Sequence, residues 1–358
     1  MKVLVTGAGG FLGSALVREL KKRGCYVRAL MRRRESAFKL HGLEVEIFIC
    51  NILDKECLRD AVQGIDVIFH TAGLVKTAYP FYQRHPQDIY RVNVEGTKNV
   101  MEAAYKAGVK KVIYTSSIAT VGKRLDGEPA DESIPLNLFH KRTHYEKSKA
   151  LAEKVALSYH HKGMHVVAVN PGFLVGIKDT FLTPIGEIIV RFLNRVYPFY
   201  FDGILYVCDI DLAAEAHIKA MEKGRSGERY IVVNQRPFTI KEIFDILERL
   251  TGIKGPRARL PSLLLYLFSI LNEIVLRILF LNNRFRPIIG SESISYFMLM
   301  ARYDGSKARK EFRLEDKLFE TTFKREVDWY MHNGYIRKSS RIRYYKKIGK
   351  LRRLRKHK

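Results

Sequence analysis

The N-terminus, MKVLVTGAGGFLGSALVREL, constrains the fold more than any other part of the sequence. A short apolar run leads into three spaced glycines, Gly7, Gly10 and Gly13, and a helical pattern follows them directly. Glycines at this spacing let the backbone approach a pyrophosphate, which the free N–H groups at the start of the helix then bind. No Gly-Lys-Ser/Thr ending follows, which disfavours a nucleoside triphosphate loop. We therefore predict a dinucleotide-binding loop, and we expect Phe11 and Leu12 to contact the dinucleotide as well.

Short apolar runs alternate with helical patterns through the first half of the chain, which predicts a parallel sheet covered by helices. The fold class is therefore α/β, with a Rossmann-type doubly wound sheet and a smaller, mainly helical C-terminal substrate-binding region. We expect strands at residues 2–6, 26–29, 45–49, 67–70, 111–115 and 165–169, later strands at 204–207 and 230–233, and helices at 14–23, 89–107, 145–160 and 211–222.

Two separate stretches of the chain make up each predicted domain. The nucleotide-binding domain is expected to take residues 1–171 and 204–234, and the substrate-binding region residues 172–203 and 235–336. Residues 337–358 hold 12 Lys or Arg and no acid, so we expect a disordered basic tail there. The net charge of the whole chain is +26, and subtracting these 12 charges leaves +14, so residues 1–336 are basic as well.

The four cysteines, Cys25, Cys50, Cys57 and Cys208, form no CxxC pair and no Cys/His spacing typical of a metal site. We expect them to be buried thiols in a reducing compartment. No secretory signal fits the first residues, because a strand and a glycine loop stand where an apolar targeting stretch would lie. These features predict a cytoplasmic protein without a bound metal.

The residues after the second expected strand bear on the choice of cofactor. An Asp or Glu at this place binds the ribose 2′-hydroxyl of NAD, whereas an Arg suits the 2′-phosphate of NADP. Arg32 and Arg33 stand here, and Glu35 follows closely. We therefore expect NADP as the preferred cofactor, with NAD as the alternative.

The strongest chemical signal is the pair Tyr145 and Lys149, which share one face of an expected helix because they are four residues apart. A tyrosine with a pKa of about 10 is a poor base at neutral pH. A lysine cation about 4 Å away would contribute about 4 kcal/mol at an effective dielectric of about 20. We therefore expect Lys149 to lower the pKa of Tyr145, which would exchange a proton with a substrate oxygen during hydride transfer.

The segment 114–117, YTSS, places hydroxyl groups at the end of an expected parallel strand, where such sheets hold their active sites. Ser117 is expected to hold the substrate oxygen beside the tyrosine, with Ser116 or Thr115 as alternatives. A second Tyr-x-x-x-Lys copy, Tyr303 to Lys307, contains a helix-weakening glycine and follows no Ser-Ser strand. We interpret that copy as structural.

Taken together, these motifs resemble the extended short-chain dehydrogenase/reductases over about residues 2–335. The chain is most similar to the dihydroflavonol-4-reductase-like group and the hopanoid-associated sugar epimerases, and more distantly to 3β-hydroxysteroid dehydrogenases. The motifs are Thr6-Gly7-x-x-Gly10-x-x-Gly13, His70-Thr71-Ala72-Gly73, Asn93-Val94-Glu95-Gly96-Thr97, Tyr114 to Ser117, Tyr145-x-x-x-Lys149 and Asn170-Pro171-Gly172.

The resemblance implies roles for further residues. Lys149 would also bind the nicotinamide ribose, and Asn51, with Ile52 beside it, takes the place of the family's adenine-contacting Asp. A homodimer is also implied. The residues expected to pass beside the cofactor are Thr71, Ala72 and Gly73, and those expected to flank the nicotinamide are Pro171, Gly172 and Phe173.

We therefore predict an NAD(P)-dependent oxidoreductase that transfers hydride between nicotinamide and a secondary alcohol or ketone of a lipid-, steroid- or sugar-like substrate. One alternative is an epimerase/dehydratase that keeps its cofactor tightly bound, since the same catalytic residues serve both reactions. A second is a non-catalytic dinucleotide-sensing protein, although such a protein has no need of the catalytic set. Aromatic residues at 181–201 would either line an apolar substrate pocket or fill a small core.

The segment 262–281, SLLLYLFSILNEIVLRILFL, is strongly apolar but has Ser269, Asn272, Glu273 and Arg277 on one helical face. That stripe fits a helix of the substrate-binding region, or one at a membrane interface, better than a spanning helix. Together with residues 337–358, the segment would place the protein peripherally on the anionic inner face of a membrane. Nucleic acid is the less favoured partner of the tail.

Overall fold

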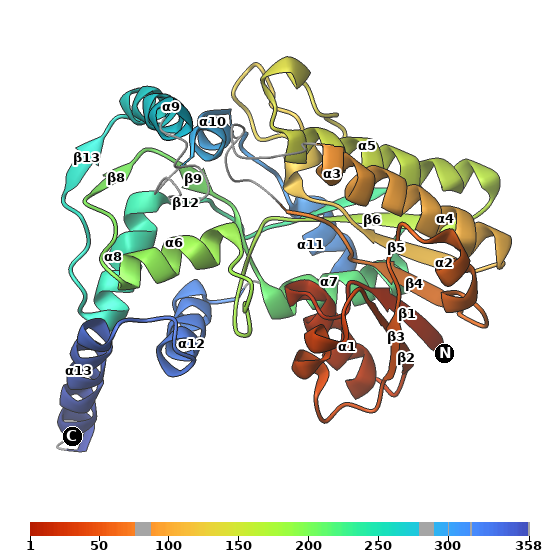
Figure 1. Ribbon diagram of the computed structural model, residues 1–358, viewed down its shortest axis with the longest axis horizontal. Coiled ribbons are helices and arrows are strands. Elements are labelled where there is room, and N and C mark those ends of the chain that lie inside the picture. Colours follow the sequence, from red (N-terminus) through yellow and green to blue (C-terminus); the bar gives the residue numbers. More distant parts are fainter. Residues whose placement is uncertain (76–86, 279–289, 300, 316, 357–358) are drawn as a thin grey trace.

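A seven-stranded parallel sheet forms the centre of one half of the molecule (Figure 1). The computed structural model describes residues 1–75, 87–278, 290–299, 301–315 and 317–356. In spatial order the strands are β11 (Arg229–Val232), β6 (His165–Pro171), β5 (Lys111–Thr115), β4 (Val67–His70), β1 (Lys2–Thr6), β2 (Tyr26–Met31) and β3 (Glu46–Ile49). The order reverses beside β1, which makes the sheet doubly wound and gives a ligand site at the carboxyl ends of β1 and β4.

Helices cover both faces of this sheet, because its strands are apolar on both sides. One group packs around α7 and the other around α4. The first comprises α1 (Phe11–Lys22), α7 (Ile210–Lys223) and α11 (Ser306–Phe312), and the second comprises α2 (Lys55–Ala61), α4 (Gly96–Lys106) and α5 (His144–Ser158).

The expected strands of the first 170 residues, and the one at 230–233, lie in the central sheet. Residues 204–209, which the sequence placed in the nucleotide-binding domain, do not join it. They form two short strands, β9 (Ile204–Leu205) and β10 (Val207–Asp209), which pair with β12 (Phe238–Thr239) and β7 (Phe173–Val175). A strand-like apolar pattern predicts an extended segment but does not show which strand it pairs with.

The C-terminal half is mainly helical around a second apolar core, as expected. Figure 1 shows it as a separate layer beside the sheet, with α9 and α10 at one end and α13 at the other. Its elements are α6 (Pro184–Leu193), β8 (Phe199–Phe201), α8 (Ile240–Thr251), β13 (Ala258–Leu260), α9 (Ser262–Ile278), α10 (Ser291–Leu299), α12 (Phe319–His332) and α13 (Lys338–Lys356).

The structure places a helix, α13, in the basic tail for which disorder was expected. Tyr344 is only 2% exposed and belongs to the second core, as does Ile336 just before the helix. The Tyr344 hydroxyl also donates a hydrogen bond to Asp328 of α12. A few apolar residues among the basic ones therefore anchor the start of the helix to the domain.

The cysteines differ from their prediction as well. The structure joins Cys50 and Cys57 by a disulfide, with their Cα atoms 5.9 Å apart, because the turn after β3 brings the start of α2 back to the end of that strand. Cys25 and Cys208 are buried thiols, as expected. No helix in the described parts of the chain is long and apolar enough to span a membrane.

Candidate active site

The loop between β1 and α1 leaves room for a phosphate because its glycines lack side chains. Gly7 has a φ of +70°, and a Cβ atom there would lie 2.9 Å from the backbone of Ala72. A Cβ atom on Gly13 would lie 2.2 Å from the carbonyl oxygen of Gly7. No side chain caps the N-terminus of α1, whose N-cap is Gly10, so its first N–H groups remain available to an anion.

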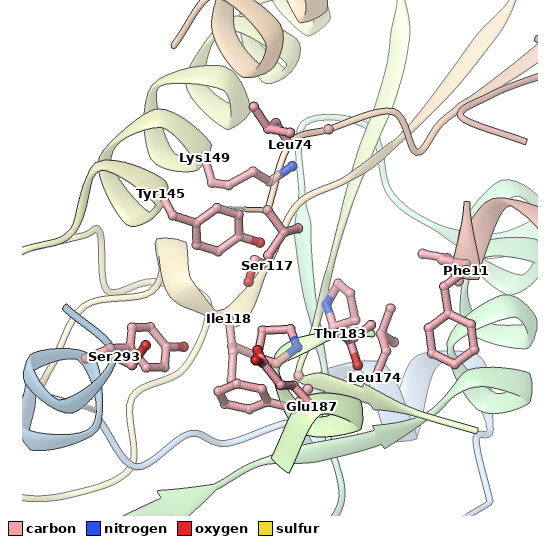
Figure 2. Close-up of a pocket in the computed structure, with 18 of the residues that line it drawn as sticks. Phe11, Leu74, Ser117, Ile118, Tyr145, Lys149, Leu174, Thr183, Glu187 and Ser293 are labelled. Carbon is pink, nitrogen blue, oxygen red and sulfur yellow. The ribbon is translucent and has the colours of Figure 1, made fainter. Parts of the chain in front are cut away.

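A cavity of about 340 Å³ opens from this loop and holds the predicted catalytic residues (Figure 2). Figure 2 shows Tyr145 and Lys149 projecting from α5, with Ser117 beside them and Phe11 across the cavity. The predicted site residues that line the cavity are Gly7, Gly10, Phe11, Leu12, Gly13, Thr71, Gly73, Thr115, Ser116, Ser117, Tyr145, Lys149, Pro171, Gly172 and Phe173.

The other predicted cofactor contacts lie outside this lining. Ala72 packs behind Gly7 and donates its N–H to the Thr6 hydroxyl at 3.2 Å. Asn51 is exposed and its side chain accepts the N–H of Leu53, while Ile52 is buried in the core.

Arg32 and Arg33 follow β2 and are exposed. The short helix after them lies against the glycine loop, because a Cβ atom on Gly9 would meet the Ser36 side chain at 2.5 Å. The two arginines therefore directly precede a helix that borders the glycine loop, and neither of them lines the cavity.

A firm N-terminal cap positions Tyr145 at the start of α5. Thr143 and Glu146 form a reciprocal capping box. Glu146 also forms a buried ion pair with Arg142, at 2.9 Å. Burial raises the pKa of Tyr145, and a hydrogen bond with the Ser117 hydroxyl opposes that rise. Ser117 itself caps the short turn after β5 by accepting the N–H of Ala119 at 3.2 Å. Tyr145 and Ser117 therefore lie together, as predicted.

The Lys149 ammonium forms two hydrogen bonds with β5. Its ammonium donates to the hydroxyl of Tyr114 at 2.9 Å and to the carbonyl of Thr115 at 2.7 Å. Burial lowers the pKa of Lys149 to about 7, against the opposing charge of Glu153. In this state burial raises the pKa of Tyr145, and the Lys149 ammonium bonds to Tyr114 and Thr115, so the expected effect of Lys149 on Tyr145 stays a prediction.

Tyr114 is a functional candidate that the sequence did not single out. Its ring is buried in the sheet at the end of β5, and the Lys149 ammonium lies 4.5 Å from its centre. Burial raises the pKa of its hydroxyl well above the ordinary value. A signal was present, because this tyrosine precedes the Thr-Ser-Ser run on the strand that leads into the site.

Asn93 connects the cofactor side of the site to the catalytic helix. The expected helix at 89–107 is interrupted here by a π-helical turn, Arg91–Glu95, a feature often found at functional sites. The Asn93 side chain accepts the N–H of Leu74 at 2.7 Å and donates to the Ser148 hydroxyl at 2.9 Å. It therefore holds the loop after β4 against α5.

His70, at the end of β4, is a structural residue of the same region. It bonds to the Thr6 hydroxyl at 2.7 Å and to the Thr97 hydroxyl at 3.0 Å. Burial, with the nearby Lys149 charge, lowers its pKa to about 3, so the ring is neutral at neutral pH. Two strands and a helix are joined through this one side chain.

The wall facing the catalytic residues is mainly apolar. Of the aromatic residues at 181–201, Tyr197 and Phe201 line it, whereas Phe181 is exposed. Two side chains with opposite charge also reach this wall, Glu187 and Arg191, and they pair at 2.5 Å. The cavity lining also includes Leu74, Val75, Ile118, Leu174, Thr183, Pro184, Ile188, Gly290, Ser293, Tyr296 and Phe297.

Comparison with known proteins gives consistent results. The model of the NAD dependent epimerase/dehydratase family matches residues 3–234. The chain is 33% identical over 337 residues to the putative dihydroflavonol 4-reductase of Synechocystis sp., covering 93% of this chain and 95% of that protein. It is 34% identical over 337 residues to sterol demethylase protein B of Methylococcus capsulatus, covering 94% and 100%. The crystal structure of gox2253 matches with a TM-score of 0.79 at 31% identity, covering 94% of this chain and 99% of that one.

Proposed function

The chain belongs to the NAD dependent epimerase/dehydratase family within the extended short-chain dehydrogenase/reductases, and from this premise we propose that it is an NADPH-preferring reductase of apolar ketones. Family membership makes it an NAD(P)-dependent oxidoreductase or epimerase. The observation that carries the finer proposal is that Tyr145, Ser117 and the glycine loop line one cavity whose far wall is mainly apolar.

The residues around the loop suit a dinucleotide. Gly7 and Gly13 leave the space that a Cβ atom would fill, and the uncapped first turn of α1 offers N–H groups to the pyrophosphate. Thr71, Gly73 and the stretch 171–173 line the same cavity and would flank the nicotinamide ring. When bound, the nicotinamide supplies or accepts the hydride.

Tyr145 would give the proton that balances the hydride. Burial keeps its phenol protonated at neutral pH, which is the state that a proton donor to a carbonyl oxygen requires. Ser117 would hold that oxygen beside the phenol. Lys149, when protonated, would stabilise the phenolate left behind and would bind the nicotinamide ribose. Because its pKa is about 7, its charge state near neutral pH responds to whatever binds beside it.

The far wall supports an apolar substrate. Leu174, Phe201 and Phe297 line the same cavity as the catalytic residues, and Ile118 lies beside Ser117. A relative that is 34% identical bears the name sterol demethylase protein B. We therefore propose a ring-bearing lipid or steroid-like ketone as the substrate class.

The preference for NADP rests on Arg32 and Arg33. They follow β2, at the place where a ribose-binding acid would stand in an NAD site. Both are exposed, and no ion pair to either arginine is found among the described residues, so their guanidinium groups would be available to a 2′-phosphate.

An epimerase acting on a nucleotide-linked sugar is less well supported by the cavity. A sugar diphosphate needs cations on the substrate side. Among the described lining residues, Lys149 and Arg191 are the two cations, and Arg191 is paired with Glu187. An epimerase acting on an apolar alcohol would use the same catalytic residues and remains the second candidate.

Isotope transfer tests the proposal. The purified protein is incubated with NADPH deuterated at the transferable position and with a panel of cyclic and steroid ketones, and the products are examined by mass spectrometry. A reductase gives an alcohol carrying one deuterium and an equal amount of NADP. Tyr145→Phe should abolish this transfer, whereas Tyr303→Phe, from the second Tyr-x-x-x-Lys copy, should not. Inversion of an added alcohol without net consumption of NADPH would instead indicate the epimerase.

A further inference from the structure

Helix α9 buries Ser269 and Glu273, leaves Asn272 half-buried, and exposes an apolar stripe. Ser269 and Glu273, which the sequence placed on one polar face, are 2% and 0% exposed, and Leu265 is buried with them. The exposed positions recur every three or four residues, so they form one continuous stripe along the helix. We call this stripe the α9 face; it comprises Leu263, Leu264, Leu267, Phe268, Leu271, Ile274, Val275 and Ile278, each 41–67% exposed.

Specific hydrogen bonds fix this orientation. The Glu273 carboxylate accepts the N–H and the hydroxyl of Ser291, both at 2.8 Å, at the start of α10. The buried Ser269 hydroxyl is satisfied within α9 itself, by the carbonyl of Leu265 at 2.7 Å. A rotation of α9 that turned the apolar residues inward would break both hydrogen bonds that Glu273 accepts from Ser291. The outward apolar face is therefore a consequence of the polar anchor beneath it.

Helix α9 is connected to the substrate cavity through α10. Helix α10 packs on α9, and it contributes Ser293, Tyr296 and Phe297 to the cavity wall. Figure 1 shows the two helices side by side at the edge of the substrate-binding region. The helical pair therefore has the cavity on one side and an exposed apolar surface on the other.

We propose that the α9 face docks on the surface of an anionic lipid bilayer and that the protein takes an apolar ketone dissolved in that bilayer. The substrate part of this inference rests on the function proposed above, whereas the docking part does not. All eight side chains of the face are hydrocarbon, with no polar group to form the hydrogen bonds that a specific protein interface carries. A continuous apolar surface of this kind is what an interfacial helix buries among acyl chains.

The charge of the chain favours a bilayer as the occupant. Without the 12 basic residues of 337–358 the chain still has 51 Lys or Arg against 37 Asp or Glu, a net charge of +14, and an anionic bilayer attracts basic proteins with about 1 kcal/mol for each Lys or Arg near its surface. The same charge opposes the approach of a second copy of this chain. Figure 1 places α13 at the far end of the substrate-binding region from α9, so we assign the insertion to the α9 face alone.

Vesicle flotation of the full-length protein tests the docking. The probe is vesicles of phosphatidylcholine and phosphatidylglycerol in equal amounts, compared with phosphatidylcholine alone, without cofactor or substrate. The double variant Leu267→Gln/Leu271→Gln should lose about tenfold or more in partitioning. The matched double variant Leu125→Gln/Leu318→Gln removes two exposed leucines outside α9 and should float as the parent does.

Each result bears on the inference. Flotation of the parent with the anionic vesicles, lost in the α9 variant alone, supports it. Absence of flotation in the parent, or equal loss in both variants, overturns it. A parent dimer that the α9 variant dissociates, with no vesicle binding, also overturns it and assigns the face to a second copy. Because the assay contains no cofactor or substrate, failure of the proposed reductase activity would leave this result unchanged.

Discussion

The ammonium of Lys149 lies 2.9 Å from the hydroxyl of Tyr114 and donates a hydrogen bond to it. The bond is buried, and Tyr114 lies on β5 directly before Thr115. The lysine also donates to the Thr115 carbonyl, so both of these partners are on β5. The tyrosine beside Ser117 and the tyrosine that holds the lysine are thus two different residues. This arrangement leads to the first prediction.

Tyr114→Phe should move the alkaline limb of the pH profile of ketone reduction to lower pH. The variant removes an acceptor from an ammonium that stays buried, which lowers the pKa of Lys149 further below its ordinary value. The charged lysine, which is proposed to stabilise the Tyr145 phenolate, is then lost at a lower pH, and kcat above neutral pH should fall about tenfold. Tyr159→Phe is the matched control, because that hydroxyl bonds to Glu102 outside the site. An unchanged profile in Tyr114→Phe would remove Tyr114 from the positioning role.

Tyr145→Phe should lower kcat by about 10²–10⁴-fold, the usual contribution of a general acid. Binding of NADPH should remain close to that of the parent, because the phenol is proposed to act on the substrate and not on the nucleotide. Stopped-flow kinetics and NADPH fluorescence titration separate the two quantities. Equal losses in both would indicate that Tyr145 shapes the nucleotide site and does not transfer the proton.

Arg32→Ala/Arg33→Ala should raise the KM for NADPH about tenfold or more and leave the KM for NADH nearly unchanged. The guanidinium groups are proposed to bind a phosphate that only NADPH carries. Arg34→Ala removes the neighbouring exposed arginine and serves as the control. If the double variant weakens both cofactors equally, the arginines do not discriminate between them.

Glu326→Gln should remove a loss of stability that the parent shows as the pH rises. Glu326 is fully buried on α12, and burial, with the nearby Asp179, raises its pKa well above the ordinary 4.5. The folded chain therefore keeps a proton that the unfolded chain releases above about pH 4.5, so the free energy of unfolding falls as pH rises until Glu326 ionises in the folded state.

Urea denaturation at about pH 5 and about pH 8 measures this difference. The decline between the two conditions should be smaller in Glu326→Gln than in the parent. The control is Glu320→Gln, an exposed glutamate on the same helix. A parent decline that persists in full in Glu326→Gln would show that other groups cause it.

Local patterns in the sequence are enough to predict the strands and the glycine loop. Each depends on residues whose position along one element determines where they point. The direction of Lys149 could not be predicted in this way, because Tyr114 and Thr115 lie on a strand 34 or more residues earlier in the chain.

The helix α9 shows a different limit of the sequence. Its periodicity defines a polar stripe around Glu273, but periodicity does not state which stripe faces the core. The partner that turns the polar stripe inward is Ser291, on the next helix. The disulfide between Cys50 and Cys57 and the anchoring of α13 by Tyr344 also depend on contacts between elements.

The measurement that tests the central claim most directly is the nucleotide content of the purified protein, followed by titration of its free sites. The protein is denatured and any released nucleotide is identified, and the native protein is then titrated with NADPH and NADH. A reductase that exchanges its cofactor at each turnover should release little nucleotide and should bind NADPH more tightly than NADH. Near-stoichiometric NAD that survives purification would contradict the reductase and favour the epimerase, and failure to bind either nucleotide would contradict the whole account.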